Sequence, residues 1–310
     1  MHRVGLSPPH IGSDGMADTL VLLNARAGAV IDAGAERIRD ALASSLKERS
    51  ADVKIRLVRP SYLRAEIERA ARSEISTLIV GGGDGSVNCA ANALAGTSKT
   101  LGVLPFGTMN LFARDLRMPA NIEEAIEAIG DARPRKVDLA RVNGRSFHSL
   151  SGLGFFSEMA RAREEVRGHK LGRLIGVGIA ALRALRRTYP FKLDIRADDR
   201  REQVEALAVL VTNNRFAPDW RRPSLDEGVL EIHIAEHAGA LSKLKASANL
   251  LTGTWRNDDD TDGIRTISAR QVAIGRTRRR TFAATDGELR REHIPLRYEM
   301  QPGALTVLSL

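Results

Sequence analysis

The segment Leu78–Asn88, with the sequence Leu-Ile-Val-Gly-Gly-Gly-Asp-Gly-Ser-Val-Asn, decides the fold. It predicts a short buried strand that runs through a glycine turn into a helix. Glycine is costly to order and fills no core volume, so this run of glycines serves close approach of the backbone to a ligand. The first turn of the following helix adds partial positive charge. The segment therefore predicts a phosphate site.

The two commonest phosphate loops do not match this segment. The Gly-Lys-Ser/Thr ending of the nucleoside triphosphatase loop is missing, and Ser86 stands where the dinucleotide fingerprint has its third glycine. Asp84 would repel a bare phosphate, but it suits a loop that also holds Mg²⁺ or a nucleotide hydroxyl. The plainer alternative is a tight turn with Asp84 or Ser86 as the helix cap.

Strands and helices alternate on both sides of this segment. We expect strands at 19–23, 53–58, 75–80 and 99–104, and helices at 33–48, 64–72, 86–94, 108–116 and 122–129. This alternation predicts a parallel sheet covered by helices, with ligands beyond the carboxyl ends of the strands. The polar loops at 24–28, 81–86 and 105–110 should meet at that edge. We expect a Rossmann-like α/β nucleotide-binding domain at 18–138, after a disordered lead at 1–17.

The pattern changes after about residue 135. The dipeptide Asn143-Gly144 predicts a hairpin between strands at 137–142 and 146–151. One long helix is expected at 157–188. Further strands are expected at 191–196, 205–212, 229–235, 263–267, 271–274, 281–284, 294–300 and 304–308. Strand following strand predicts a mostly antiparallel β domain at 139–310.

The composition restricts the class of protein. The length of 310 residues suits two domains, and no apolar run is long enough for a transmembrane helix. Cys89 is the only cysteine, so we expect no disulfide framework and a cytosolic location. The net charge of +9 favours an anionic partner. No zinc motif is present among the histidines, and no nucleic-acid motif is recognised.

Several motifs in order resemble the catalytic domain of diacylglycerol kinases, a family that includes sphingosine, ceramide and bacterial soluble lipid kinases. The matching segments are Gly82–Asn88, Leu101–Asn110, Ser149–Phe155, Thr285–Glu288 and Pro302–Val307. The resemblance covers most of residues 19–310. It implies an NAD kinase/diacylglycerol kinase-like fold, with a β-sandwich-like second domain whose last strand returns to the first domain.

The resemblance also implies ATP-dependent phosphoryl transfer to a lipid hydroxyl, in a cleft between the domains. The residues expected to contact ATP are Asn24, Gly28, Gly82, Gly83, Asp84, Gly85, Ser86, Asn88 and Thr108. The first loop lacks the proline and serine usual in the family, so only Asn24 and Gly28 carry over from it. The catalytic carboxylates are expected to be Asp286 and Glu288.

The chemistry of the reaction is consistent with this carboxylate pair. A lipid hydroxyl loses its proton as it attacks the γ-phosphorus, and a carboxylate within reach can accept it. An extended segment would place Asp286 and Glu288 on one side. In the alternative, one carboxylate acts directly while the other orients it from a turn. Which of the two is the base is left open, and without the family match an ordinary surface Asp-Gly turn is the simpler interpretation.

The family also has a structural Mg²⁺ site, and the matching segment here is Pro223–Leu230. Ser224 and Val229 would supply oxygens, and Glu227 stands where the family has aspartate. Asp226 is an alternative ligand, and a plain acidic turn is an equal alternative to a metal site. ATP and Mg²⁺ are therefore the expected cofactors.

The expected partners are a membrane lipid as substrate, the cytoplasmic face of the inner membrane as a peripheral contact, and a second copy of the chain in a homodimer. The run Arg276–Arg280 could face a membrane, the ATP phosphates or water. Two other functions remain open at this stage. One is an NAD kinase or sugar kinase of related fold, and the other is a non-catalytic nucleotide-binding protein.

Overall fold

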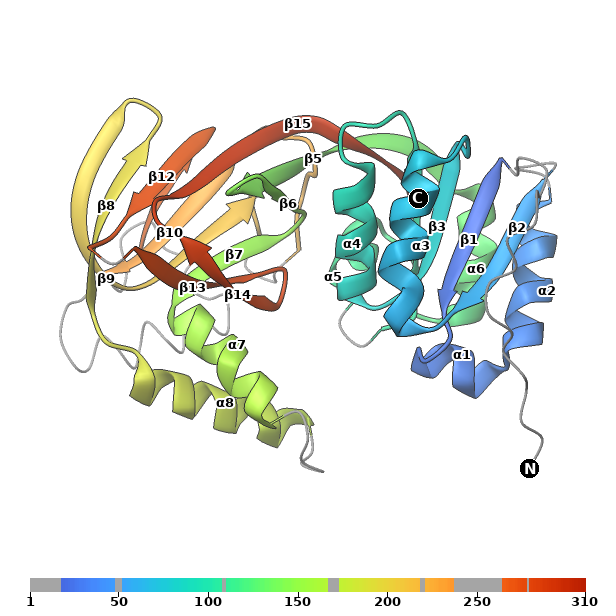
Figure 1. Ribbon diagram of the computed structural model, residues 1–310, viewed down its shortest axis with the longest axis horizontal. Helices are drawn as coiled ribbons and strands as arrows, with labels where there is room; N and C mark the ends of the chain where they lie inside the picture. The colour runs from blue at the N-terminus through green and yellow to red at the C-terminus, as the bar shows by residue number, and fades with distance from the viewer. Residues whose placement is uncertain are drawn as a thin grey trace.

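The computed structural model describes residues 18–47, 52–107, 110–166, 173–217, 221–236, 264–277 and 279–310. Figure 1 shows two lobes side by side, with the first half of the chain in one lobe and most of the second half in the other. The predicted lead at 1–17 lies outside the described residues, and so does Thr108.

The first lobe is a parallel sheet covered by helices, which confirms the predicted α/β fold. Its strands are β1 (Thr19–Asn24), β2 (Val53–Val58), β3 (Thr77–Gly82) and β4 (Thr100–Pro105), and they lie in the order β4-β3-β1-β2. Its helices are α1 (Gly28–Ala33), α2 (Ala35–Leu46), α3 (Pro60–Arg72), α4 (Asp84–Leu94), α5 (Leu111–Asp115) and α6 (Ile122–Asp131). Strands covered on both faces read as continuous apolar runs, and β1, β3 and β4 are buried almost throughout.

The second lobe is mostly antiparallel, as predicted. Its strands are β5 (Arg133–Val142), β6 (Arg145–Phe147), β7 (Leu150–Gly154), β8 (Phe191–Ala197), β9 (Arg200–Asn213), β10 (Leu230–Glu236), β11 (Ile264–Ala269), β12 (Gln271–Gly275), β13 (Arg280–Thr285), β14 (Glu288–His293) and β15 (Leu296–Ser309). The single long helix expected at 157–188 is wrong, because α7 (Phe155–Val166) and α8 (Arg173–Arg187) are two helices that pack on each other, and α7 lies beside β13 and β14 (Figure 1).

Several predicted elements differ in extent from the observed ones. The helix expected at 33–48 is α2, which begins after Gly34, and a further short helix, α1, precedes that glycine, whose φ is 84°. The two strands expected at the C-terminus form the single strand β15. Strand β14 was not predicted, because its sequence is largely polar and half-exposed at a sheet edge, with little apolar alternation to reveal it.

Strand β15 belongs to both lobes. It runs antiparallel to β5 and β12, and its end pairs in parallel with β4 at Thr306↔Thr100 and Val307↔Leu101. Its first half contributes Tyr298 to the core of the second lobe, and its last residues contribute Val307 to the core of the first. The chain shifts register between Gln301 and Leu305, so one continuous strand crosses from one core to the other.

This shared strand predicts cooperative unfolding. Because β5 and β15 connect the two cores through a continuous ladder, loss of one core should remove pairing from the other. We expect a single thermal transition in differential scanning calorimetry, with equal calorimetric and van't Hoff enthalpies. Two separated transitions would contradict the shared ladder.

Candidate active site at the domain junction

The three predicted loops meet at the carboxyl edge of the parallel sheet. Asn24 ends β1, and its Cβ lies 3.8 Å from the place that a Cβ on Gly82 would occupy. Gly28 begins α1, and the space where its side chain would point is open. Gly82 ends β3 and packs against Ser86, whose Oγ would lie 2.7 Å from a Cβ at Gly82. The loop after β1 therefore lies beside the glycine turn after β3.

The third loop touches the glycine turn backbone to backbone. A Cβ on Gly107 would lie 2.4 Å from the Cα of Gly83, a distance that real Cβ atoms do not reach. Only Gly107 must lack a Cβ, because a Cβ on Gly83 would lie at an ordinary 3.5 Å from the Cα of Gly107. Position 107 therefore has no room for a side chain, because the main chains of the two loops are in contact.

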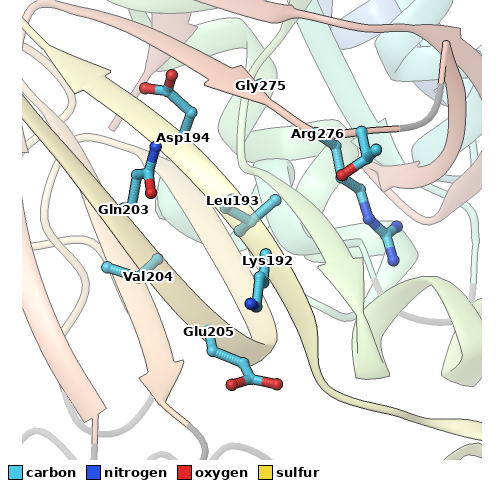
Figure 2. Close-up of a pocket in the computed structure, with 9 residues that line it drawn as sticks. Lys192, Leu193, Asp194, Gln203, Val204, Glu205, Gly275 and Arg276 are labelled. Atoms are coloured by element: carbon cyan, nitrogen blue, oxygen red, sulfur yellow. The ribbon is translucent and has the colours of Figure 1, made fainter.

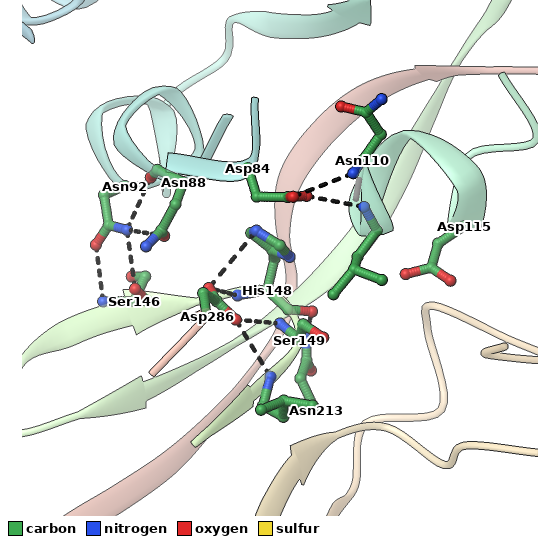
Figure 3. A network of polar contacts seen from close by, with 12 residues as sticks. Asp84, Asn88, Asn92, Asn110, Asp115, Ser146, His148, Ser149, Asn213 and Asp286 are labelled. Carbon is green, nitrogen blue, oxygen red and sulfur yellow. Dashed lines mark hydrogen bonds and ion pairs between the residues drawn. The ribbon is translucent and has the colours of Figure 1, made fainter. Parts of the chain in front are cut away.

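Asp84 joins these two loops. Its Oδ2 accepts a hydrogen bond from the Asn110 N–H at 3.1 Å, and its Oδ1 accepts one from the Leu111 N–H at 2.8 Å (Figure 3). These are the first N–H groups of α5, so Asp84 caps a helix 27 residues further along the chain instead of its own. Asn110 completes the junction by accepting from the Gly107 N–H at 2.9 Å and donating to the carbonyls of Pro105 and Gly107.

Asn88 lies one turn along α4 and faces the second lobe. It accepts a hydrogen bond from Asn92, which also donates to the Ser146 carbonyl and accepts from the Ser146 N–H, all between 2.8 and 2.9 Å (Figure 3). Asn88 therefore belongs to a network that fixes α4 against β6. The position of Asn88 relative to Asp84, four residues apart, puts both side chains on one face of the helix.

Asp286 is buried and fully engaged with the backbone. Its side chain is 1% exposed, and its oxygens accept N–H groups from His148 at 2.9 Å, Ser149 at 3.0 Å and Leu150 at 3.2 Å (Figure 3). The preceding residue Thr285 bonds the hydroxyl of Ser151 at 2.9 Å. Asp286 thus fixes the segment between β6 and β7, which explains why the single strand expected at 146–151 is interrupted there.

Glu288 has a different environment from Asp286. Its side chain is 37% exposed, and Oε1 lies 3.9 Å from the place of a Cβ on Gly85 in the phosphate loop. Oε2 accepts hydrogen bonds from Arg290 at 3.1 and 2.5 Å. The two carboxylates are separated by a turn with φ of 46° at Asp286 and 81° at Gly287, so the extended arrangement with both on one side does not occur. Glu288 is the carboxylate that faces the glycine turn.

Sequence reasoning missed three residues behind this site. His148 is buried against the ring of Phe112, with centroids 4.6 Å apart, and its Nε2 lies 3.6 Å from Oδ2 of Asp286. Arg222 bonds Asp115 at 2.6 and 3.0 Å, with both side chains almost fully buried, and donates to the His148 carbonyl. No spacing or periodicity in the sequence pairs these residues, because they come from distant segments that meet only in the fold.

The acidic side chains of the predicted metal loop lie beside two arginines, Arg135 and Arg215. The hydroxyl of Ser224 bonds Asp226, which itself pairs with Arg135 at 3.1 Å. Glu227 lies 3.6 Å from Arg215, and the Val229 carbonyl accepts the Asn214 N–H at 2.9 Å. The Val229 carbonyl thus has a partner already and the Glu227 carboxylate lies beside an arginine, and within the described residues no cluster of three metal-ligating side chains is present. The metal site at Ser224, Glu227 and Val229 therefore stays a prediction.

Comparison with known proteins identifies the family. The diacylglycerol kinase catalytic domain matches residues 18–142, and the YegS C-terminal NAD kinase beta sandwich-like domain matches residues 159–309. The chain belongs to the diacylglycerol kinase catalytic-domain family. It carries the YegS-like C-terminal domain of that family's bacterial members, and the resemblance stated from the sequence motifs is confirmed.

This chain is similar to individual members of the family over different shares of their length. A diacylglycerol kinase of Bacillus subtilis is 31% identical over 203 residues, which cover 62% of this chain and 65% of that protein. A probable lipid kinase YegS-like of Enterobacter is 28% identical over 76% of this chain and 82% of that protein. The chain spans about half to two thirds of several such relatives, from 47% to 65%. The crystal structure of a putative diacylglycerol kinase from Bacillus anthracis superimposes with a TM-score of 0.74 at 25% identity, over 94% of this chain and 97% of that chain.

The contact between the glycine loops generates a first prediction about stability. Gly107→Ala forces the two main chains apart, and overpacking of this kind costs about 1–3 kcal/mol in the free energy of unfolding. Gly83→Ala, on the other side of the same contact, should be nearly neutral, because its Cβ has ordinary room. Urea unfolding of the two variants measures the difference. Equal effects would mean that the loops do not touch as described.

The buried histidine generates a second prediction. Burial lowers the pKa of His148 below its ordinary value of 6.5, and Asp286 only partly opposes this. As the pH falls through that value, the unfolded chain binds a proton that the folded protein does not, so the folded state loses stability. Between about pH 7.5 and about pH 5.5, the wild type should lose more unfolding free energy than His148→Gln.

The matched control for this variant is His293→Gln, at an exposed histidine. Its pH dependence in urea unfolding should follow the wild type. If His148→Gln also follows the wild type, His148 does not stay neutral in the folded protein.

Proposed function

We propose that this chain is an ATP-dependent lipid kinase that transfers the γ-phosphate to a hydroxyl of a lipid. One observation carries the proposal: the solvent-accessible carboxylate of Glu288, from the second lobe, faces Gly85 of the phosphate loop in the first. A phosphoryl-transfer site needs phosphate-binding N–H groups on one side and a proton acceptor on the other. The relatives named diacylglycerol kinase and probable lipid kinase support the lipid as the acceptor.

The phosphates of ATP would lie against the glycine turn. The turn of Gly82, Gly83 and Gly85 leads into α4, Gly85 is exposed there, and the N-terminus of the helix supplies N–H groups and partial positive charge. Asn24 and Ser86 lie beside Gly82 in this turn, and Gly28 begins α1 in the loop after Asn24. Thr108, also expected to contact ATP, lies outside the described residues.

Glu288 would accept the proton of the lipid hydroxyl. It is the accessible carboxylate of the pair, and Arg290 fixes one of its oxygens while the other is turned to the loop. Asp286 would act as a positioning residue, because its oxygens already accept three backbone N–H groups and hold the turn that presents Glu288. Two carboxylates with different environments take different roles.

Mg²⁺ would accompany the nucleotide at this site. The carboxylates of Asp84 and Glu288 border the phosphate loop and provide the oxygen ligands that Mg²⁺ prefers. Each oxygen of Asp84 accepts one N–H and keeps a lone pair for a further partner, so these residues fit the ion. When bound, the ion neutralises charge on the transferring phosphoryl group.

The acceptor we favour is a membrane lipid such as diacylglycerol, or a sphingoid or ceramide lipid, reached at the cytoplasmic membrane face. Among the helices of the described residues, none has the length and apolar character to span a bilayer. Because the second domain matches an NAD kinase beta sandwich-like family, NAD and sugar phosphates are the alternative acceptors to be tested beside lipids.

The test is transfer of labelled phosphate from ATP in the presence of Mg²⁺ to a panel of dispersed lipids, NAD and fructose 6-phosphate. We expect product only with a lipid. Glu288→Gln should lower kcat by about 10²–10⁴-fold, the range for loss of a general base, with little change in the melting temperature. Transfer to NAD alone, or no transfer to any acceptor by the folded protein, would overturn the proposal.

Asp286→Asn provides the comparison. The new amide NH₂ would face backbone N–H groups, which costs about 1–3 kcal/mol of stability for an unpaired buried donor. We therefore expect a lower melting temperature together with lower activity. The opposite result would be an Asp286→Asn variant that is fully stable but inactive, together with a Glu288→Gln variant of normal activity. That result would make Asp286 the proton acceptor and Glu288 the positioning residue.

A further inference from the structure

A second pocket lies between the helical pair α7–α8 and the β13–β14 hairpin, with a volume of about 890 Å³. Its lining is strongly basic, with six arginines and one glutamate. The arginines are Arg161, Arg187, Arg276, Arg279, Arg280 and Arg291. The phosphate loop and the residues around Asp286 contribute nothing to this lining, so the pocket is separate from the candidate active site.

Two of the arginines are held in place by aromatic rings. The guanidinium carbon of Arg276 lies 4.1 Å from the ring centre of Phe191, and that of Arg161 lies 4.7 Å from the ring centre of Phe282. A guanidinium stacked on a ring presents its N–H groups at its own edge, in the guanidinium plane, and Arg276 donates one of them to the Thr281 hydroxyl at 3.3 Å. These contacts preorganise the walls of the pocket.

The positive charge of the pocket exceeds what its acidic neighbours neutralise. Glu158, the acidic residue of the lining, pairs with Arg161 at 3.5 Å, and Arg187 pairs with Glu165 at 2.7 Å. Arg279, Arg280 and Arg291 are solvent-exposed. Like charges gathered without balancing carboxylates create a local positive potential that favours an anionic ligand.

The basic character extends past Arg276, because an adjoining hollow is lined by Arg196, Arg276, Arg279 and Arg297, with Asp194 as its acidic residue. The pocket in Figure 2 shares Arg276 with the arginine-rich pocket, but its other charged residues are mixed in sign: Lys192, Asp194 and Glu205. The basic surface thus covers the two hollows that share Arg276 and Arg279, and it is not continued in the pocket of mixed charge.

Two aromatic side chains stand at the rim of the basic pocket. Tyr189 is 74% exposed and Phe282 is 40% exposed, on either side of the arginines. Exposed aromatic rings beside cationic groups are typical of surfaces that rest in the headgroup region of a bilayer.

The pocket lies on the far side of the hairpin from the reacting groups. Arg291 and Glu288 are three residues apart in β14, so their side chains leave opposite faces of the strand, about 10 Å apart along it. Arg280 and Phe282 are two apart in β13 and share one face with Arg291, the cross-strand partner of Phe282. The arginine run thus does not face the ATP phosphates, one of the three options that its sequence left open.

We propose that this pocket docks the phosphate headgroups of anionic phospholipids at a bilayer surface. The planar forks of the exposed arginines suit bidentate binding of phosphate oxygens, and Phe282 and Tyr189 would enter the interface. The docked hairpin carries Glu288 at its other end, so the membrane would be held beside the acceptor side of the active site. The proposal rests on the proposed function only for the presence of a membrane, and docking requires no ATP.

The test is co-sedimentation of the full chain, without ATP, with vesicles of phosphatidylcholine alone or mixed equally with phosphatidylglycerol. The wild type should bind the anionic vesicles and not the neutral ones. Arg280→Gln with Arg291→Gln should weaken binding by about 25-fold, since a basic residue near an anionic surface is worth about fivefold. The matched control is Arg39→Gln with Arg72→Gln, which removes the same charge from exposed positions on α2 and α3 and should bind like the wild type.

Competition experiments distinguish headgroup docking from binding of soluble phosphate or of nucleic acid. Inorganic phosphate at the same concentration as the lipid headgroups should not displace the protein, whereas displacement would indicate a soluble phosphate ligand and overturn membrane docking. Binding to single-stranded DNA in preference to vesicles would also overturn it. Equal weakening in both double variants would show a general charge effect and contradict a local pocket.

Two measurements keep the proposal testable if a variant is unstable or inactive. In the wild type, anionic vesicles should slow amide hydrogen exchange at 279–293 and around Tyr189, and protection elsewhere alone would contradict the site. With a short-chain, water-soluble lipid acceptor, Arg280→Gln with Arg291→Gln should keep wild-type turnover. If the wild type lacks kinase activity yet docks on vesicles through this pocket, the proposed function fails while the docking site stands.

Discussion

The site depends on one carboxylate, that of Asp84, which binds the first N–H groups of α5 from the neighbouring loop. This cap holds the loop after β4 against the glycine turn after β3, so closely that Gly107 has no room for a side chain. A carboxylate that accepts backbone N–H groups at a helix terminus benefits from both hydrogen bonding and the helix dipole. The same contact leaves the N-terminus of α4 open to a ligand, which is what a phosphate site requires.

A second set of contacts places the other lobe over that loop. Arg222 and Asp115 form a buried ion pair between the segment before β10 and α5, and removal of one partner of such a pair would leave an uncompensated charge. Asp286 fixes the segment after β6, and Asn92 fixes α4 to β6. Together with β15, which enters both cores, these contacts hold Glu288 opposite the phosphate loop. The geometry of the site is therefore built from polar contacts that are satisfied only when both lobes are folded.

The sequence predicted the parts of this structure that depend on local pattern. Buried parallel strands, the hairpin at Asn143-Gly144 and the glycine turn follow from apolar runs and from residues that tolerate positive φ. The family resemblance of the motifs also predicted the two domains that the structure shows. The sequence could not reveal that Asp84 caps a distant helix, that Asp286 is buried while Glu288 is accessible, or that Arg215 faces Glu227. Each of these depends on which distant segment supplies the partner, and no local pattern encodes that choice.

The central claim is that the phosphate loop and Glu288 form one phosphoryl-transfer site across the junction of the lobes. The most direct measurement is a crystal structure of the protein with Mg²⁺ and a non-hydrolysable ATP analogue. We predict that the terminal phosphate lies between the backbone of Gly82–Gly85 and the carboxylate of Glu288, with the contact between Gly83 and Gly107 preserved. A nucleotide bound away from the glycine turn, or a terminal phosphate out of reach of Glu288, would contradict the claim.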